Sequence, residues 1–132
     1  MNQPPYKLYY TDDDVDDRML FEEVAGAINE IQQLSVFESG IHLLRHLESI
    51  NEKDLPTSIV CDMKMHLMDG LEVLEKLKEN PCWSKIPVTI LTTSSSRLEK
   101  EKALKAGAKD FITKPVTISE LEAIIRKILF YQ

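Results

Sequence analysis

Short apolar runs alternate along this chain with longer amphipathic segments, and this alternation restricts the possible folds more than any other feature. The runs typical of β-strands are residues 6–11, 33–37, 57–61, 88–91 and 110–113. Each intervening segment is long enough for a helix, and the connections are short. Because crossovers between parallel strands are right-handed, such units build a parallel sheet with helices on both faces. We therefore expect an α/β, doubly wound fold with five parallel strands and five helices.

Helical periodicity and capping signals mark the segments between the strands. The first segment is amphipathic, and its apolar residues at helical spacing are Val15, Met19, Val24 and Ile28. The fourth helix is preceded by a capping box of Ser96 and Glu99, and Gly107 stands where a helix C-cap glycine belongs. Thr117 and Glu120 form a second capping box before the last helix.

Composition limits the class of partner. The chain has 132 residues, a formal net charge of −6 and a hydrophobic share of 43%. Its negative charge argues against nonspecific binding to nucleic acid or to an anionic membrane, and no run approaches the roughly 20 apolar residues of a membrane span. The start MNQPPYK lacks the regions of a signal peptide, so we expect a cytoplasmic protein. Because Cys61 and Cys82 form no CxxC pair, we expect free thiols.

Polar and charged residues directly follow four of the expected strands. Asp12 and Asp13 follow the first strand, Asp62 the third, Thr92 the fourth and Lys114 the fifth. In sheets of this type, ligands bind beyond the carboxyl ends of the strands. Carboxylates that crowd together repel one another unless a cation compensates them. These residues therefore predict a cation-binding pocket at one edge of the sheet.

The acidic run TDDDVDD, at residues 11–17, contains more carboxylates than such a pocket needs. Asp14, Asp16 and Asp17 are expected at the exposed start of the first helix, where the helix dipole favours negative charge. His42 and His46 have the i,i+4 spacing of a metal-binding pair. No third ligand is evident for them, so we expect ordinary solvated or half-buried helix residues.

Four short motifs at these strand ends resemble those of one known family. They are the pair Asp12-Asp13, DMKMHLMDG at residues 62–70, LTTSSS at residues 91–96 and ITKP at residues 112–115. Together, and in this order, they are similar to the receiver domains of two-component response regulators, over about residues 6–130. The resemblance implies one receiver domain over residues 1–132 and the flavodoxin-like strand order 2-1-3-4-5.

The resemblance also implies a phosphoryl acceptor and a metal site. Asp62 would be the acceptor, forming an acyl phosphate, and Mg²⁺ would offset the repulsion between the carboxylate and the phosphoryl group. By analogy with the family, Asp13 and Asp62 bind the ion directly, while Asp12 acts largely through water. The backbone carbonyl of Lys64 would supply another oxygen. The Lys64 side chain, two residues after the acceptor, would tune the lifetime of the acyl phosphate.

The remaining motif residues have implied roles in holding the phosphoryl group and in switching. The Thr92 hydroxyl and the Lys114 ammonium would hold the phosphoryl oxygens. A cis peptide bond before Pro115 would aim the lysine. Thr92 would move toward the phosphate, coupled to movement of Phe111, a switch position that here lacks a tyrosine hydroxyl. His66 departs from the family pattern, because many receivers have proline there.

The implied function is that of a stand-alone phosphoacceptor in a two-component phosphorelay. A histidine kinase or histidine phosphotransfer protein would donate the phosphoryl group, and the chain would catalyse only formation and hydrolysis of its own acyl phosphate. Because the chain ends at Gln132, soon after the last helix, we expect no DNA-binding or enzymatic output domain. Phosphorylation would then switch a surface for an unidentified downstream protein, with no nucleic acid or membrane partner.

Two other classes of function remain open at the level of sequence. One is a small Mg²⁺-dependent phosphohydrolase of the haloacid dehalogenase type, whose D-x-D-x-[TV] motif is loosely matched by residues 12–15. In that class the nucleophile would be Asp12, and Asp62 would have no clear role. The other is a binding module of the same fold that is never phosphorylated.

Overall fold

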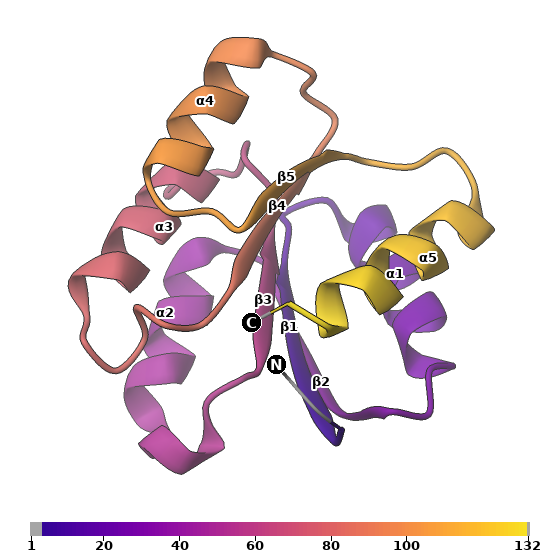
Figure 1. Ribbon diagram of the computed structural model, residues 1–132, viewed down its shortest axis with the longest axis horizontal. Coiled ribbons are helices and arrows are strands. Elements are labelled where there is room, and N and C mark those ends of the chain that lie inside the picture. Colours follow the sequence, from indigo (N-terminus) through magenta and orange to yellow (C-terminus); the bar gives the residue numbers. More distant parts are fainter. Residues whose placement is uncertain (1–3, 132) are drawn as a thin grey trace.

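The computed structural model describes residues 4–131 and shows one parallel β-sheet (Figure 1). Within these residues the sheet has five strands in the order β2-β1-β3-β4-β5. The strands are β1 (Tyr6–Thr11), β2 (Ile31–Phe37), β3 (Ser58–Cys61), β4 (Val88–Thr92) and β5 (Asp110–Thr113). The predicted flavodoxin-like order is confirmed, and the strand ends differ from the predicted ones by at most two residues.

Helices cover both faces of the sheet, as predicted. Within the described residues they are α1 (Val15–Gly26), α2 (Gly40–Ser49), α3 (Gly70–Glu79), α4 (Arg97–Lys105) and α5 (Ile118–Leu129), with a short 3-10 helix η1 (Glu52–Asp54) before β3. In Figure 1 the sheet stands between α1 and α5 on one side and α2, α3 and α4 on the other.

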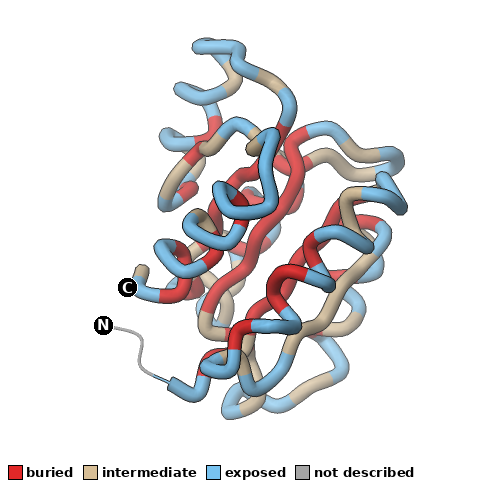
Figure 2. The backbone as a smooth tube through the Cα atoms, turned by 90° about the vertical axis from the view of Figure 1, so that its right-hand side faces the viewer, coloured by how far each residue is buried: buried red, intermediate tan, exposed pale blue. Residues whose placement is uncertain are grey.

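Side chains that alternate along β1 divide the core into two layers. Leu8 and Tyr10 pack with residues of α1 and α5, whereas Tyr9 packs with residues of α2 and α3. The central strands are buried along their length, and exposed residues lie on the outer sides of the helices (Figure 2). Because β3 and β4 are covered on both faces, they are almost continuously apolar in sequence.

The buried face of α1 differs from the apolar pattern of its sequence. Of the four apolar residues at helical spacing, Val24 and Ile28 are buried, whereas Val15 and Met19 are 54% and 64% exposed. The residues of this segment that are buried against the sheet are Phe21, Val24, Ala25 and Ile28. The Phe21 ring stacks on Tyr10 with ring centres 3.9 Å apart. This stacking turns the adjacent apolar stripe of the helix, which carries Val15 and Met19, toward solvent.

The two predicted capping boxes form only in part. Ser96 and Thr117 each accept a hydrogen bond from the N–H three residues later, at 3.3 and 3.1 Å. The carboxylate of Glu99 does not return the bond to Ser96; it accepts a hydrogen bond from the Ser94 hydroxyl instead. Within residues 4–131 both bonds of a capping box form only at the start of α3, between Asp69 and Glu72.

Three smaller predictions can be compared with the structure. Gly107 follows α4 with a φ of 111°, as expected of a glycine at a helix C-terminus. Cys61 is buried and Cys82 exposed, and among the described residues both are free thiols, as predicted. Over the same part of the chain, every helix is too short or too polar to cross a membrane.

Thr89 allows a test of the packing of β4. Its hydroxyl is buried and has no hydrogen-bond partner among residues 4–131. Because an unpaired buried polar group costs free energy, we predict that Thr89→Val raises the free energy of unfolding by about 1 kcal/mol. Denaturant unfolding measures the change.

The matched control for this prediction is Thr57→Val. The Thr57 hydroxyl donates to the Lys7 carbonyl at 3.0 Å and accepts from the Lys7 N–H at 3.1 Å. This substitution should therefore lower the free energy of unfolding. A loss of stability in both variants would contradict the assignment of Thr89 as unpaired.

Candidate functional site

The carboxyl ends of β1, β3 and β5 bring an ammonium group and two carboxylates together. Lys114 Nζ lies 2.8 Å from Asp12 Oδ2 and 2.9 Å from Asp62 Oδ2. The backbone pairing of the sheet continues into these residues, because the Asp62 N–H donates to the Thr11 carbonyl at 3.1 Å. Likewise the Lys114 N–H donates to the Thr92 carbonyl at 2.7 Å. The sheet therefore fixes the backbone from which each charged side chain extends.

Asp17 also belongs to this group, contrary to the sequence prediction. Its Oδ2 lies 2.6 Å from Lys114 Nζ, and its side chain is 37% exposed, so its prediction as a solvated helix residue was wrong. Asp14 and Asp16 do have the predicted positions. Asp14 is the N-cap of α1 and accepts from the Asp17 N–H at 2.9 Å, and Asp16 is exposed. Because α1 begins shortly after β1, its first turn lies over the same edge of the sheet.

Asp12 is the most enclosed member of the group. Its side chain is 0% exposed. Its Oδ2 accepts a hydrogen bond from the Tyr10 hydroxyl at 2.5 Å, and its Oδ1 accepts from the Asp14 N–H at 3.0 Å. The Arg18 guanidinium donates to the Asp12 backbone carbonyl at 2.8 Å. Both carboxylate oxygens of Asp12 are therefore already engaged.

Burial makes the charges of this group depend on one another. The side chains of Lys114 and Asp62 are only 12% and 9% exposed. Burial alone lowers the pKa of Lys114, but hydrogen bonds to the three carboxylates outweigh it and raise that pKa above its ordinary value. Burial and the adjacent Asp12 carboxylate raise the pKa of Tyr10, so its hydroxyl keeps its proton. The cation that compensates the acidic run in this structure is thus the Lys114 ammonium.

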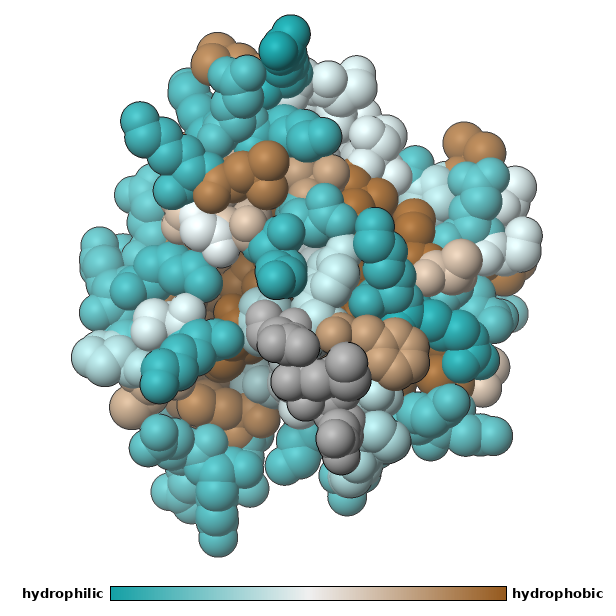
Figure 3. All heavy atoms as spheres, viewed as in Figure 1, coloured by the Kyte–Doolittle hydropathy of each residue, from teal (hydrophilic) through white to brown (hydrophobic). Residues whose placement is uncertain are grey.

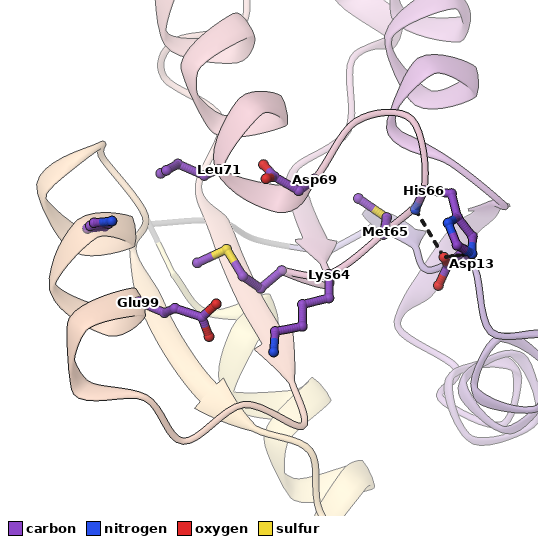
Figure 4. A pocket seen from close by; sticks show the side chains of 9 residues that line it. Asp13, Lys64, Met65, His66, Asp69, Leu71 and Glu99 are labelled. Carbon is purple, nitrogen blue, oxygen red and sulfur yellow. Dashed lines mark hydrogen bonds and ion pairs between the residues drawn. The ribbon is translucent and has the colours of Figure 1, made fainter.

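Asp13 points away from this group, toward the loop that follows β3. Its Oδ2 accepts from the His66 N–H at 3.1 Å, and the His66 ring atom Nε2 lies 3.8 Å from the same oxygen (Figure 4). Asp13, Lys64 and His66 line a groove of about 510 Å³ that reaches α4. Within it, the Lys64 side chain extends toward Glu99 and away from Asp13 (Figure 4). The groove leaves Asp13 accessible from outside.

A glycine holds the start of α3 against Asp62. The Gly70 N–H donates to the Met63 carbonyl at 2.8 Å. A Cβ atom at Gly70 would lie 2.4 Å from the backbone oxygen of Asp62, so a larger residue would push this strand end out of place. The Lys64 N–H donates to Asp62 Oδ1 at 3.3 Å. The Asp-Gly pair in the motif thus packs the helix start directly against the backbone of Asp62.

Thr92 and Phe111 lie beside the group, on β4 and β5. Thr92 is fully buried, and its Oγ1 accepts a hydrogen bond from the Ser94 N–H at 3.4 Å. Phe111 is 7% exposed and packs in the core layer beneath α2 and α3. In this structure the Thr92 hydroxyl is therefore engaged with its own loop.

The peptide bond between Lys114 and Pro115 is trans, so the prediction of a cis bond was wrong. Within residues 4–131, only Pro4 and Pro5 are joined by a cis bond. The trans isomer is the lower in energy for most bonds to proline. With this isomer, Lys114 still reaches all three carboxylates.

Carboxylate oxygens near Asp62 are ligands of the type that Mg²⁺ prefers, but in this structure they do not converge on one metal position. Among the described residues, no three His, Cys, Asp or Glu side chains are grouped so that they could hold a metal ion. Asp12 and Asp62 face Lys114, while Asp13 faces His66. Mg²⁺ prefers oxygen ligands and keeps several waters, so a few carboxylates suffice.

The geometry does not favour the haloacid dehalogenase alternative. In that class Asp12 would be the nucleophile. Its side chain is fully buried, and both of its oxygens accept hydrogen bonds. Asp62 lies at the same site with some exposure and is the better placed of the two.

The bond from Tyr10 to Asp12 leads to a prediction about stability. Tyr10→Phe should lower the free energy of unfolding by about 1–3 kcal/mol, because it removes a donor from a buried carboxylate. The ring that stacks on Phe21 is kept. Denaturant unfolding measures the loss, and the same change in an Asp12→Asn background should cost less. Equal costs in the two backgrounds would contradict this hydrogen bond.

Comparisons with known proteins show the family and the fold of this chain. A family model described as the response regulator receiver domain matches residues 11–126. Response regulator PleD of Caulobacter vibrioides is 40% identical over 76 residues, which make up 58% of this chain and 17% of PleD. This chain therefore spans less than a fifth of the length of that relative.

Two solved structures of response regulators resemble the whole fold. The phosphorylated cyanobacterial phytochrome response regulator RcpA superposes with a TM-score of 0.82 at 25% identity, covering 93% of this chain and 90% of RcpA. The Mn(2+)-bound form of response regulator Rcp1 superposes with a TM-score of 0.80 at 25% identity, covering 94% and 91%. The family model, the strand order and the residues at the strand ends all indicate the same family. The chain belongs to the family of response regulator receiver domains in two-component signalling.

Proposed function

We propose that this receiver domain accepts a phosphoryl group on Asp62. The observation that carries the proposal is the placement of Asp62 at the end of β3, 2.9 Å from Lys114 Nζ and with 9% of its side chain exposed. Among the residues that the structure describes, only the Lys64 N–H donates to its Oδ1, at the long distance of 3.3 Å. Asp62 therefore combines a cation to neutralise added charge with an oxygen that a donor can approach.

In the proposed reaction an Asp62 oxygen attacks the phosphorus of a phosphohistidine. The new O–P bond forms as the P–N bond breaks, and the electron pair of that bond stays on the imidazole nitrogen, which then takes a proton. The Lys114 ammonium and the Thr92 hydroxyl hold the phosphoryl oxygens, since positioning and charge neutralisation dominate this chemistry. Water later hydrolyses the acyl phosphate to the carboxylate and inorganic phosphate, and we propose no other enzymatic activity.

We propose Mg²⁺ as the cofactor of this transfer. Asp13, Asp62 and the Lys64 backbone carbonyl would hold it, with Asp12 acting through water. When bound, the ion neutralises charge on the transferring group. The manganese in the Rcp1 structure supports a divalent cation in this family, and the groove beside Asp13 gives it access.

Thr92 and Phe111 are the proposed switch. Thr92 would leave its bond with the Ser94 N–H and move toward the phosphoryl group, and Phe111 would adjust to the space that Thr92 leaves. Both side chains are buried in the structure, so a movement of one requires repacking of its neighbours. The surface that would change is formed by α4, β5 and α5, where an unidentified downstream protein would bind.

Apolar side chains are exposed on α1 and where the chain passes from β5 into α5, and they support docking of a phosphodonor protein. They are Val15 (54% exposed), Met19 (64%) and Leu20 (37%) on α1, and Val116 (91%) and Ile118 (60%) before and in α5. Figure 3 shows apolar atoms at the upper right, where the chain passes from β5 into α5. Leu20 also lines a small hollow with Asp17 and Lys114. An apolar rim around a charged acceptor fits a histidine kinase or histidine phosphotransfer protein.

We also propose an extent and a location for the domain. Residues 1–132 would form one receiver domain, acting in the cytoplasm through protein contacts. The formal net charge of −6 argues against nucleic acid or an anionic membrane as a partner.

The first test is the site of phosphorylation. With Mg²⁺ and acetyl phosphate, we predict one added phosphoryl group on the parent chain, and loss of at least about 90% of it in Asp62→Asn, because the nucleophilic oxygen is replaced by an amide. Intact mass and peptide mapping measure both. Phosphate on Asp12 would support the hydrolase alternative, and a parent chain that stays unmodified would support a binding module.

The second test concerns the phosphodonor surface. Met19→Glu should slow phosphoryl transfer from a phosphohistidine protein by about tenfold or more, because it adds charge to an apolar contact. Transfer from acetyl phosphate should be unchanged, because a small donor needs no docking surface. Leu98→Glu, also at an exposed position (60%) but on α4, is the matched control. Equal rates for the two variants with the protein donor would contradict the assignment of this surface.

A further inference from the structure

We infer that Asp17 is a positioning residue for Lys114 during phosphoryl transfer, an inference that rests on the proposed function. An ammonium group has three N–H donors. In the structure Lys114 Nζ has three acceptors, at 2.8 Å in Asp12, 2.6 Å in Asp17 and 2.9 Å in Asp62. Every donor of the ammonium is therefore in use, and the shortest of the three contacts is the one to Asp17.

Asp17 differs from the other two acceptors in its place in the fold. Asp12 and Asp62 follow strands, whereas Asp17 lies in the first turn of α1. Its backbone N–H donates a hydrogen bond to the Asp14 carboxylate at 2.9 Å. The N-cap of the helix therefore fixes the position of the Asp17 backbone. Its side chain is 37% exposed, against 0% for Asp12 and 9% for Asp62. A carboxylate with this access to water needs no partner, yet it is turned toward Lys114.

The three contacts constrain how Lys114 can respond to a phosphoryl group. Phosphorylation converts Asp62 from a charged carboxylate into an acyl phosphate, so the donor now directed at Asp62 becomes available to a phosphoryl oxygen. The donors directed at Asp12 and Asp17 can stay where they are. Asp12 and Asp17 then hold the ammonium from two sides while only one hydrogen bond is exchanged.

Without Asp17, this restraint is lost. The ammonium would keep the two acceptors at the strand ends, and its third donor would turn to water. A charged group that is free to move stabilises a developing charge less than one that is already in place. Loss of Asp17 should therefore slow transfer to Asp62 without preventing it.

Tyr10 supports this arrangement through Asp12. Its hydroxyl donates to the same Asp12 oxygen that accepts from Lys114, and its ring stacks on Phe21 of α1. The carboxylate that faces the ammonium is thereby fixed to the core. Asp17 is the partly exposed partner, and it can be changed without opening the core.

The contact itself can be tested in the metal-free protein by NMR of lysine ammonium groups. A salt-bridged ammonium exchanges its protons slowly with water. The Lys114 signal is identified as the one that disappears in the Lys114→Arg variant. We expect Asp17→Asn to shift this signal and speed proton exchange by about tenfold. Asp16→Asn, which removes the same charge one residue earlier from an exposed side chain, should leave the signal unchanged.

The role in transfer is tested with Mg²⁺ and acetyl phosphate over a range of donor concentrations. Asp17→Asn should lower the maximal rate of Asp62 phosphorylation by about tenfold and leave the half-saturating donor concentration unchanged. Asp16→Asn should match the parent, and Asp17→Glu, which keeps a carboxylate, should recover part of the rate. An increase in the half-saturating donor concentration with an unchanged maximal rate would indicate a role in donor binding rather than in positioning, and it would overturn the inference.

Two negative results remain distinguishable. A parent chain that is never phosphorylated overturns the proposed function, and the positioning role falls with it. A phosphorylated parent whose Asp17→Asn variant keeps both the rate and the ammonium signal overturns the role of Asp17 alone. Unfolding curves of the two Asn variants exclude a general loss of structure as the cause of a slower rate.

Discussion

The acidic edge of this sheet depends on one ammonium group. Asp12 and Asp62 are almost fully buried at the ends of neighbouring parallel strands, and two charged carboxylates cannot lie there without a compensating cation. Lys114 supplies that charge from the end of β5, with Nζ within 2.9 Å of both. Because each contact is made by an enclosed side chain, loss of the ammonium would leave buried negative charge.

The fold brings together these groups from distant parts of the chain. Asp12 and Lys114 are 102 positions apart, and the parallel arrangement of β1, β3, β4 and β5 places their ends at the same edge. The close approach of Gly70 to the backbone of Asp62 holds the third strand end in position. A rigid sheet and a capped helix thus position the site, and the groove at Asp13 leaves it open.

Much of the fold could be predicted from the sequence, because apolar periodicity and capping residues are local signals that can be read along the chain. The group of Asp12, Asp62 and Lys114 could be predicted from topology, since the ends of parallel strands meet. Asp17 was missed because acidic residues are common at helix starts, although it lies in the first turn of a helix that begins shortly after Asp12 and Asp13.

Two other differences between sequence pattern and structure have similar causes. The exposed position of Met19 could not be predicted because α1 carries two apolar stripes, and the stacking of Phe21 on Tyr10 decides which one is buried. The bond between Ser94 and Glu99, which replaces half of a capping box, depends on how the loop after β4 folds back. Sequence spacing alone does not contain that information.

The role of Lys114 as the cation of this site is tested by the free energy of unfolding of the parent and of Lys114→Met, measured with and without Mg²⁺ at fixed ionic strength. Without Mg²⁺ the variant should lose about 3–5 kcal/mol, because buried carboxylates lose their cation. Mg²⁺ should then stabilise the variant more than the parent, because it no longer shares those carboxylates with an ammonium. An unchanged stability in Lys114→Met, or an equal response of both proteins to Mg²⁺, would contradict the claim that Lys114 is the cation of this site.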